Sequence, residues 1–351
     1  MSTDQRAIGD GLCRLRTIFG AWAAAAFLVL TAAAQTNPPS GAEAVLARFG
    51  YRETRVHDPS TIVKCKDDYW VFSTGMGIVS RRSKNLLKWT EGPRVFTNTP
   101  AWTTNAVPGN RGYFWAPDII RTGDGYFLYY SISTFGKNRS IIGLATNHTL
   151  DPDDPQYEWI DRGAVVESTA QDDFNTIDPA VTQDDQGKLW LAFGSFWSGI
   201  KLIQLDASTG KRIKPDSPVY SLARSGAIEA AYIYRHGGAY YLFVNWGACC
   251  RGTNSTYNVR VGRSKGITGP YLDRDGKDLE LGGGTLLLDS HPPFIGPGHA
   301  GILSYRGVDL MSCHFYNGAR QGTPVLAILR VHWDRAGWPT VEAQQDKPFK
   351  P

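Results

Sequence analysis

The chain has 351 residues, of which 42% are hydrophobic and 20% are charged, so it is long enough to bury a sizeable core as one large domain or two. Its 37 basic and 33 acidic residues leave a net charge of +4. Because no Lys/Arg cluster is present, nucleic acid is not expected as a partner.

The first 34 residues have the pattern of a secretory signal peptide. Arg14 and Arg16 precede an apolar stretch over 18–30, and small residues lead to a cleavage site after Ala34. An uncleaved membrane anchor is the alternative, because the apolar span approaches the ~17 residues that cross a bilayer. We predict cleavage and export to the extracellular space or periplasm, without stable membrane insertion afterwards. A linker is expected over 35–50 and a folded domain over 51–351.

Beyond residue 50 the sequence predicts β-strands and no long helix. Short alternating or aromatic-rich runs are separated by Gly, Asp and Asn turns, which is typical of an all-β protein. The predicted strands fall into five groups, namely 59–66, 69–74 and 78–82; 117–121, 126–133 and 140–146; 179–182, 189–193 and 200–205; 230–234, 240–245 and 258–263; 301–305, 308–315 and 325–333.

A polar residue opens each of these groups. The five residues are Asp58, Asp118, Asp178, Glu229 and His299, and they recur at intervals of about 50 to 70 residues, which suits a repeating unit of about four strands. We therefore predict a five-bladed β-propeller with four-stranded blades around a central channel. A β-sandwich, the alternative, would not need a polar residue at the same point of each unit. If every inner strand starts at the same end of the channel, these side chains gather at one mouth.

Carboxylates that converge in this way suit the cleavage of a glycosidic bond. An inverting glycosidase needs an acid for the leaving oxygen and, roughly 6.5–9.5 Å away, a carboxylate that activates water. A further carboxylate beside the acid raises its pKa by like-charge repulsion. Asp58, Asp178 and Glu229 supply these three groups, although a single Asp-Pro is also an ordinary turn. For Asp118, capping of turns at the strand start explains the residue equally well.

Eight short motifs follow one another along the chain. They are His57-Asp58-Pro59, Phe114-Trp115-Ala116-Pro117-Asp118, Ser133-Thr134-Phe135-Gly136, Asn175-Thr176-Ile177-Asp178-Pro179, Gly194-Ser195-Phe196-Trp197-Ser198-Gly199, Ile228-Glu229-Ala230, Cys249-Cys250-Arg251-Gly252 with Asn254-Ser255-Thr256-Tyr257, and Gly296-Pro297-Gly298-His299-Ala300-Gly301. In this order the chain resembles the arabinanases of glycoside hydrolase family 43, from His57 to about Trp333. The resemblance implies a five-bladed propeller enzyme that hydrolyses α-1,5-linked arabinan with inversion.

The resemblance also implies a role for each matching residue. Asp58 corresponds to the general base, Glu229 to the general acid, and Asp178 to the residue that orients the acid and tunes its pKa. Gly136, Asn175, Ser195, Phe196 and Trp197 correspond to substrate-contacting positions. Trp115 is added to this set because an aromatic face suits the apolar face of a furanose ring; a buried aromatic plug is the alternative.

His299 corresponds to a histidine near the channel centre that is associated with one cation, usually Ca²⁺, whose other ligands are largely water. A lone histidine is more often structural, and Ca²⁺ prefers oxygen ligands. Gly298 and Gly301 flank His299 and keep the backbone bare for a close ligand approach. The resemblance therefore implies a Ca²⁺ site at His299.

The cysteines and the exact activity stay open at this point. Cleavage of the signal peptide leaves Cys65, Cys249, Cys250 and Cys313, whose pairing the sequence does not fix. A bond between the adjacent Cys249 and Cys250 requires an unusual eight-membered ring, and small buried hydrophobic residues are the alternative. We expect a monomer acting on plant cell-wall arabinan or arabino-oligosaccharides. The alternatives are an exo-acting arabinofuranosidase or β-xylosidase on the same fold, and a non-catalytic carbohydrate-binding propeller.

Overall fold

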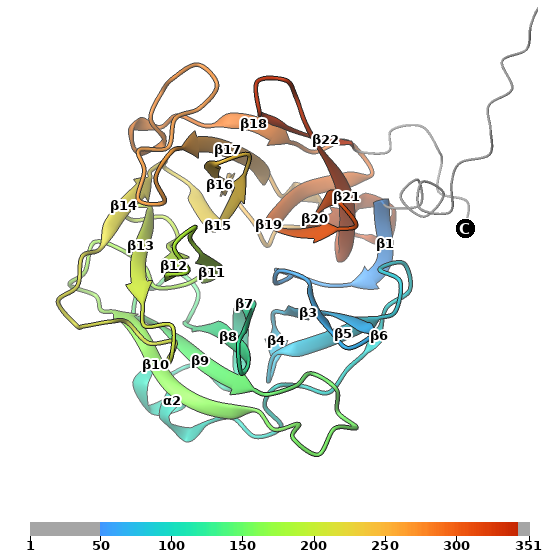
Figure 1. Cartoon of the computed structure of the whole chain (residues 1–351), viewed down its shortest axis with the longest axis vertical. Coiled ribbons are helices and arrows are strands. Elements are labelled where there is room, and N and C mark those ends of the chain that lie inside the picture. The colour runs from blue at the N-terminus through green and yellow to red at the C-terminus, as the bar shows by residue number, and fades with distance from the viewer. Residues whose placement is uncertain (1–49, 343–351) are drawn as a thin grey trace, which may run out of the picture. The chain divides into compact units, whose positions relative to one another are not determined.

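The computed structural model describes residues 50–342, which form five antiparallel β-sheets arranged around a central axis (Figure 1). The predicted signal peptide over 1–34 and the linker, except its last residue, lie outside the described residues. Among residues 50–342 the only helical elements are α2, Ala101–Ala106, and three short 3₁₀ turns later in the chain. None of the described helices is long and apolar enough to cross a membrane.

The sheets are the five predicted blades, and each blade is a meander of consecutive antiparallel strands. From the axis outward, blade I contains β2 (Val63–Cys65), β3 (Asp68–Ser73), β5 (Val79–Ser83) and β6 (Thr90–Glu91); blade II contains β7 (Tyr113–Thr122), β8 (Gly125–Ile132), β9 (Ser140–Asn147) and β10 (Ile160–Ser168); blade III contains β11 (Ala180–Gln183), β12 (Leu189–Phe193), β13 (Ile200–Leu205) and β14 (Tyr220–Ala223); blade IV contains β15 (Ile228–His236), β16 (Ala239–Trp246), β17 (Asn258–Ser264) and β18 (Thr285–Leu288); blade V begins with β19 (Phe294–Tyr305), β20 (Val308–Asn317) and β21 (Thr323–Trp333). A short strand, β4 (Gly75–Met76), pairs with β7 of blade II. The prediction of a five-bladed β-propeller is confirmed.

Blade V joins the two ends of the described chain. Strand β1 (Gly50–Arg55) pairs with β21, with Gly50 opposite Ile328 and Arg55 opposite Val325, and β22 (Pro339–Glu342) pairs with the other end of β21. In Figure 1 the blue β1 accordingly lies beside the red strands of blade V. The sequence pattern missed β1 and the outer strands of the other blades, because these strands carry few buried apolar residues.

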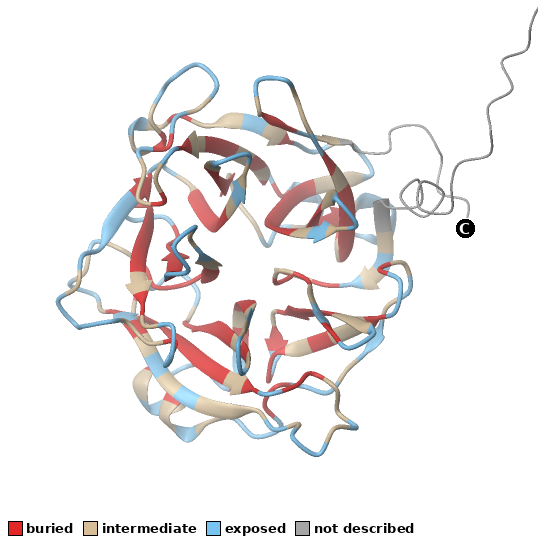
Figure 2. Ribbon diagram, viewed as in Figure 1, coloured by how far each residue is buried: buried red, intermediate tan, exposed pale blue. Residues whose placement is uncertain are grey.

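Local turn chemistry and apolar packing explain the blades. Gly237 and Gly238, with φ of 56° and 80°, supply the two positive φ angles of a two-residue hairpin between β15 and β16. Apolar side chains then fill the space between neighbouring sheets; one cluster joins Leu144 of blade II to Phe193 of blade III, both fully buried. Burial of a side chain such as Phe193 contributes about 2 kcal/mol. Figure 2 shows that buried residues occupy the inner strands, whereas exposed ones lie along turns and outer edges.

The inner end of each blade carries a residue with a left-handed backbone. Asp58, Asp178 and His299 have φ of 50°, 57° and 61°, and such angles in non-glycine residues are costly and gather at functional sites. In blades II and IV this conformation belongs to Ala116 and Ala230, with φ of 44° and 52°, and not to Asp118 and Glu229. The prediction that the five polar residues occupy equivalent positions is therefore wrong for Asp118, which lies two residues after this position, and for Glu229, which lies one residue before it. In blades I, II and III a proline directly follows this position, at Pro59, Pro117 and Pro179.

Candidate active site

A pocket of about 1220 Å³ is lined by residues from all five blades. The predicted site residues among its lining are Asp58, Trp115, Gly136, Asn175, Asp178, Ser195, Phe196, Trp197 and Glu229. His299 lies beside the pocket, where its Nδ1 is 3.7 Å from Oδ1 of Asp58. The fold therefore brings together residues that are spread over more than half of the chain.

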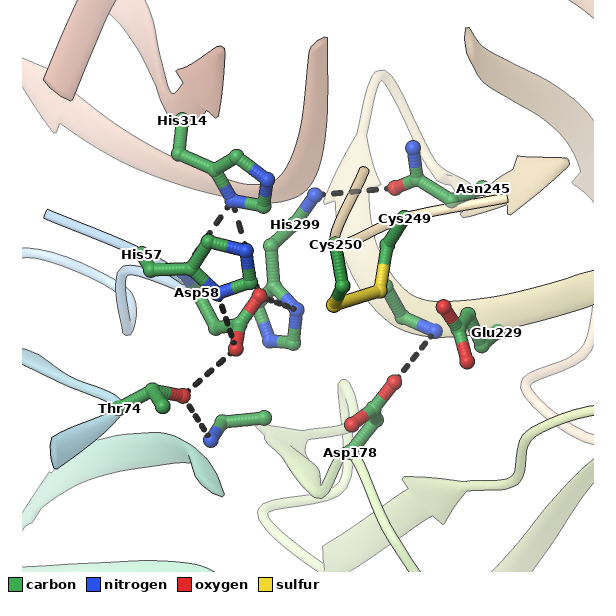
Figure 3. A network of polar contacts seen from close by, with 12 residues as sticks. His57, Asp58, Thr74, Asp178, Glu229, Asn245, Cys249, Cys250, His299 and His314 are labelled. Carbon is green, nitrogen blue, oxygen red and sulfur yellow. Dashed lines mark hydrogen bonds and ion pairs between the residues drawn. A yellow bond between two sulfur atoms is a disulfide. The ribbon is translucent and has the colours of Figure 1, made fainter. Parts of the chain in front are cut away.

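Asp58 is held by polar contacts on both carboxylate oxygens (Figure 3). Its Oδ2 accepts a hydrogen bond of 2.6 Å from the Thr74 hydroxyl and lies 2.8 Å from Nδ1 of His57. Burial by itself raises the pKa of Asp58, but the charge and hydrogen bond of His57, together with His299 and His314, outweigh burial and hold that pKa well below its usual range. Asp58 is therefore ionised at neutral pH, as a carboxylate that activates water must be.

His314 supports Asp58 from the second strand of blade V. Its Nδ1 accepts the backbone N–H of Asp58 at 3.1 Å, so the ring proton of a neutral His314 is on Nε2, which is buried without a hydrogen-bond partner. Burial keeps the pKa of His314 well below its ordinary value. His57 stacks on His314, with ring centroids 4.3 Å apart, and its Nε2 lies 2.8 Å from the Tyr316 hydroxyl. Sequence reasoning missed His314, although an isolated histidine in the apolar strand Val308–Phe315 was a signal.

Glu229 has a different environment. It is buried, and its carboxylate accepts a 2.6 Å hydrogen bond from the Ser195 hydroxyl and a short one from the Tyr257 hydroxyl. Burial raises the pKa of Glu229 and exceeds the opposing effect of the two hydroxyl groups, while the charge of Asp58 raises the pKa further. Glu229 therefore retains a proton to higher pH than an exposed glutamate, as a general acid must.

Asp178 links the acid to the neighbouring blade. Its backbone N–H donates to the Ser131 hydroxyl at 3.0 Å, and its Oδ2 accepts the N–H of Ala230, directly after Glu229, at 3.1 Å. Burial raises the pKa of Asp178 well above its usual range, and the charges of Glu229 and Asp58 add to that rise. Asp178 thus fixes the backbone directly after Glu229.

One pocket therefore holds a carboxylate whose pKa is lowered and a buried pair of carboxyl groups whose pKa values are raised. Two acidic groups whose environments drive their pKa values apart are the arrangement by which one site supplies both an acid and a base. A binding site alone requires no such separation of pKa values.

Comparison with known proteins shows which enzyme family has this kind of site. Residues 52–339 match the family model described as glycosyl hydrolases family 43. The chain belongs to glycosyl hydrolase family 43. It is 41% identical over 310 residues to an extracellular exo-α-(1→5)-L-arabinofuranosidase of Cellvibrio japonicus, covering 84% of this chain and 89% of the relative. It is 40% identical over 309 residues to an extracellular endo-α-(1→5)-L-arabinanase of Bacillus subtilis, covering 86% and 92%.

Solved structures of the family agree with the fold. The chain resembles an α-L-arabinanase of Cellvibrio cellulosa in complex with arabinohexaose, with a TM-score of 0.80 and 41% identity over 83% of this chain and 96% of that one. It also resembles a family 43 endo-arabinanase of Bacillus licheniformis, with a TM-score of 0.77 and 40% identity over 83% and 99% of the two chains. The protein is thus a glycoside hydrolase, and the alternative of a non-catalytic binding propeller is not supported.

Exposed aromatic side chains line the pocket of this family 43 enzyme. Phe196 and Trp197 are 38% and 43% exposed, and Phe135 and Tyr113 are 83% and 50% exposed. Large apolar side chains at such exposure suit contact with a ligand. Phe196 and Trp197 were predicted from the sequence, whereas Tyr113 was not, because an isolated tyrosine before a strand carries no distinctive pattern. Trp115 is half-buried.

The surroundings of His299 can be compared with what Ca²⁺ needs. The His299 backbone N–H donates to Oδ1 of Asn245 at 2.9 Å, which fixes the residue. Among the described residues, Asp58 is the carboxylate that pairs with His299. Ca²⁺ takes 6–8 ligands, mostly oxygen, so one imidazole and one carboxylate would leave most positions to water. The donor set fits only a water-rich site, which is the kind that the resemblance implies.

The structure also answers the question of the cysteines. Cys249 and Cys250 form a disulfide between adjacent residues, and both line the pocket. Cys65 and Cys313 are buried free thiols. The Cys249–Cys250 disulfide, which the sequence left open, is thus formed and lies in the wall of the pocket.

Proposed function

We propose that the protein hydrolyses α-1,5-L-arabinofuranosidic bonds of arabinan with inversion, with Asp58 as the base, Glu229 as the acid and Asp178 as the residue that tunes and orients the acid. The observation that carries this proposal is the opposite shift in pKa of Asp58 and Glu229 within one pocket. The relatives named arabinanase and arabinofuranosidase support the choice of substrate.

In this mechanism Asp58 accepts a proton from a water molecule as the water oxygen attacks the anomeric carbon. The bond from that carbon to the glycosidic oxygen breaks, and Glu229 gives its proton to the leaving oxygen. Thr74 and His57 hold the carboxylate of Asp58 in one orientation. The Ala230–Asp178 hydrogen bond holds the backbone beside Glu229. After product release, protons exchange with solvent and restore both groups.

Cleavage within the chain is the mode that pocket size supports. A volume of about 1220 Å³ exceeds the ≈ 300–1,000 Å³ of a typical small-ligand site, so several sugar units fit, and exposed aromatic residues line the pocket. The exo-acting arabinofuranosidase is the second candidate, because the relative with that name is as similar to this chain as the endo-acting one, at 41% against 40%. Neither of these two relatives is named a β-xylosidase, so they do not support that alternative.

For the cation, we propose that His299 and water hold one Ca²⁺ beside Asp58. Such an ion would add positive charge next to the base and favour its ionised form. The support is the burial of His299, its fixed backbone and its position 3.7 Å from Asp58. Isothermal titration of EDTA-treated protein with Ca²⁺, and with a His299→Ala variant as control, measures the site directly.

We also propose that the protein is secreted and monomeric. The signal pattern over 1–34 and the two relatives named extracellular support secretion. N-terminal sequencing of protein collected outside the cytoplasm should begin at Gln35, whereas an uncleaved chain in the membrane fraction contradicts cleavage. Light scattering on the mature protein checks the monomer.

The experiment that tests the activity is a product analysis over time. The mature protein is incubated with linear α-1,5-arabinan, with Glu229→Gln as the blank, and the products are separated by chromatography. Early mixed oligosaccharides that are absent from the blank establish endo action. Release of arabinose or one fixed oligomer from the start establishes the exo alternative. If the folded protein releases no product from arabinan but cleaves xylan or another furanoside in parallel, the proposed substrate is wrong.

A further inference from the structure

The disulfide between Cys249 and Cys250 lies where it can contact a substrate. Both residues line the pocket that also contains Asp58, Asp178 and Glu229, and Cys250 is exposed. Figure 3 shows the two sulfur atoms between the histidine cluster around Asp58 and the pair formed by Glu229 and Asp178. The disulfide therefore lies in the same pocket as Asp58 and Glu229, the two carboxyl groups proposed as base and acid.

A role in global stability does not explain this bond. A disulfide stabilises a fold mainly by closing a loop in the unfolded chain, and the effect grows with the length of that loop. Cys249 and Cys250 are adjacent, so the bond closes no loop that the chain could otherwise open. Burial does not explain it either, because Cys250 is exposed whereas the free thiols Cys65 and Cys313 are buried.

The loop that carries the disulfide is fixed by hydrogen bonds to its backbone. The N–H of Cys250 donates to the Tyr316 hydroxyl at 2.7 Å. The N–H of Ala248 donates to the Thr256 hydroxyl at 2.9 Å, and the carbonyl of Ala248 accepts from the Ser255 hydroxyl at 2.9 Å. Because these contacts use the backbone, the two sulfur atoms are free to face the pocket, and the ring that they close has no rotatable side-chain bond to immobilise when a ligand binds.

The chemistry of the disulfide suits one face of a sugar. It has no hydrogen to donate and its sulfur atoms are polarisable and weak acceptors, so it presents a rigid apolar patch next to charged groups. A furanose ring offers C–H groups on one face and hydroxyl groups around its edge. An apolar patch at this place suits the C–H face, and the polar residues Asn175 and Ser195, which also line the pocket, suit the hydroxyl groups.

We propose that the Cys249–Cys250 disulfide is a substrate-binding surface on which a furanosyl unit packs at the bond to be cleaved. The inference rests on the proposed function and extends it to a further binding element. Two free thiols at these positions, or two alanines, present a mobile or smaller surface, so the loss is expected in substrate affinity more than in turnover.

The test compares three forms of the mature protein with wild type on arabinohexaose. The first is wild type reduced with TCEP, in which native alkylation and mass spectrometry confirm two new thiols at 249 and 250. The second is Cys249→Ala/Cys250→Ala. The third, Cys65→Ala, is the control, because this cysteine is buried outside the pocket. Thermal unfolding of each form shows that it is folded.

We expect KM to rise about tenfold in the reduced protein and in the double-alanine variant, which corresponds to about 1.4 kcal/mol, with kcat within threefold of wild type. The dissociation constant of arabinohexaose for Glu229→Gln should rise by the same factor when the two alanines are added. The control should keep the wild-type KM. Reoxidation of the reduced protein should restore KM.

A KM within twofold of wild type in both reduced and double-alanine proteins overturns the inference. So does a loss of kcat at unchanged KM, which would show that the loop acts through Tyr316 and His57 on Asp58 instead. If wild type does not cleave arabinan, the proposed substrate fails; the same KM comparison is then made on the glycan that it does cleave, so that the two failures remain separate results.

Discussion

Asp118 offers a sharp test of how the blades are joined. Its carboxylate is buried and accepts the backbone N–H of Thr61 at 2.9 Å and that of Val181 at 2.8 Å. A single side chain of blade II therefore holds the segments that begin blades I and III. Asp118 does not line the pocket, so we predict that replacing it by alanine lowers stability and leaves the chemistry intact in the folded protein.

The magnitude follows from the two bonds. Leaving a buried N–H without a partner costs about 1–3 kcal/mol, so Asp118→Ala should lower the free energy of unfolding by about 2–6 kcal/mol. Because a whole domain is stable by only about 5–15 kcal/mol, Asp118→Asn is the milder variant. Its amide keeps one carbonyl oxygen and loses one of the two bonds, which should cost about 1–3 kcal/mol.

Urea unfolding followed by fluorescence measures both losses, and Asp153→Ala is the matched control. Asp153 is exposed, so its replacement should change stability by no more than about 0.5 kcal/mol. Well below the unfolding midpoint, kcat of both Asp118 variants should stay close to wild type. Unchanged stability in Asp118→Ala, or a folded Asp118→Asn protein with kcat reduced a hundredfold, would refute the reasoning and give Asp118 a role in the reaction.

Asp118 also has a pH signature. Burial raises its pKa from 3.8 to about 6, so in this window the folded protein binds a proton that the unfolded chain has released. Stability from this group is therefore fully present below about pH 4 and falls as pH rises to about 6. Asp118→Asn should remove that part of the pH dependence, which urea unfolding at several pH values checks.

Further predictions concern the site. Ser195→Ala removes a hydrogen bond that lowers the pKa of Glu229, so the alkaline limb of kcat/KM should move to higher pH; a limb that moves to lower pH contradicts this role. His57→Phe removes the group that most lowers the pKa of Asp58, so the acidic limb should move to higher pH, and an unmoved limb would exclude His57 from that role. EDTA should lower activity or the unfolding temperature of wild type but not of His299→Ala; equal responses would argue against an ion at His299.

Much of the architecture was predictable because strand and turn patterns are local. The hairpin at Gly237-Gly238 and the buried strand over 189–193 each depend only on consecutive residues. Repetition of such strand and turn patterns along the chain predicted the number of blades. Strand β1 was not predictable, since its partner β21 is more than 250 residues away. Its own residues carry no alternation strong enough to mark a strand.

The candidate site divides in the same way. The sequence by itself determined that carboxylates recur near the starts of the inner strands, that they stand in the motifs of family 43, and that Asp58, Asp178 and Glu229 differ from ordinary turn residues as a set. Only the tertiary structure decided that Ala116 and not Asp118 takes the equivalent place in blade II. It also decided that His314 lies against Asp58 and that the disulfide faces the pocket. The physical reason is that a pKa depends on burial and on groups brought close by folding. His57, the sequence neighbour of Asp58, lowers the pKa of Asp58 most, whereas the burial of Asp58 and its contacts with His299 and His314 of blade V arise only in the folded chain.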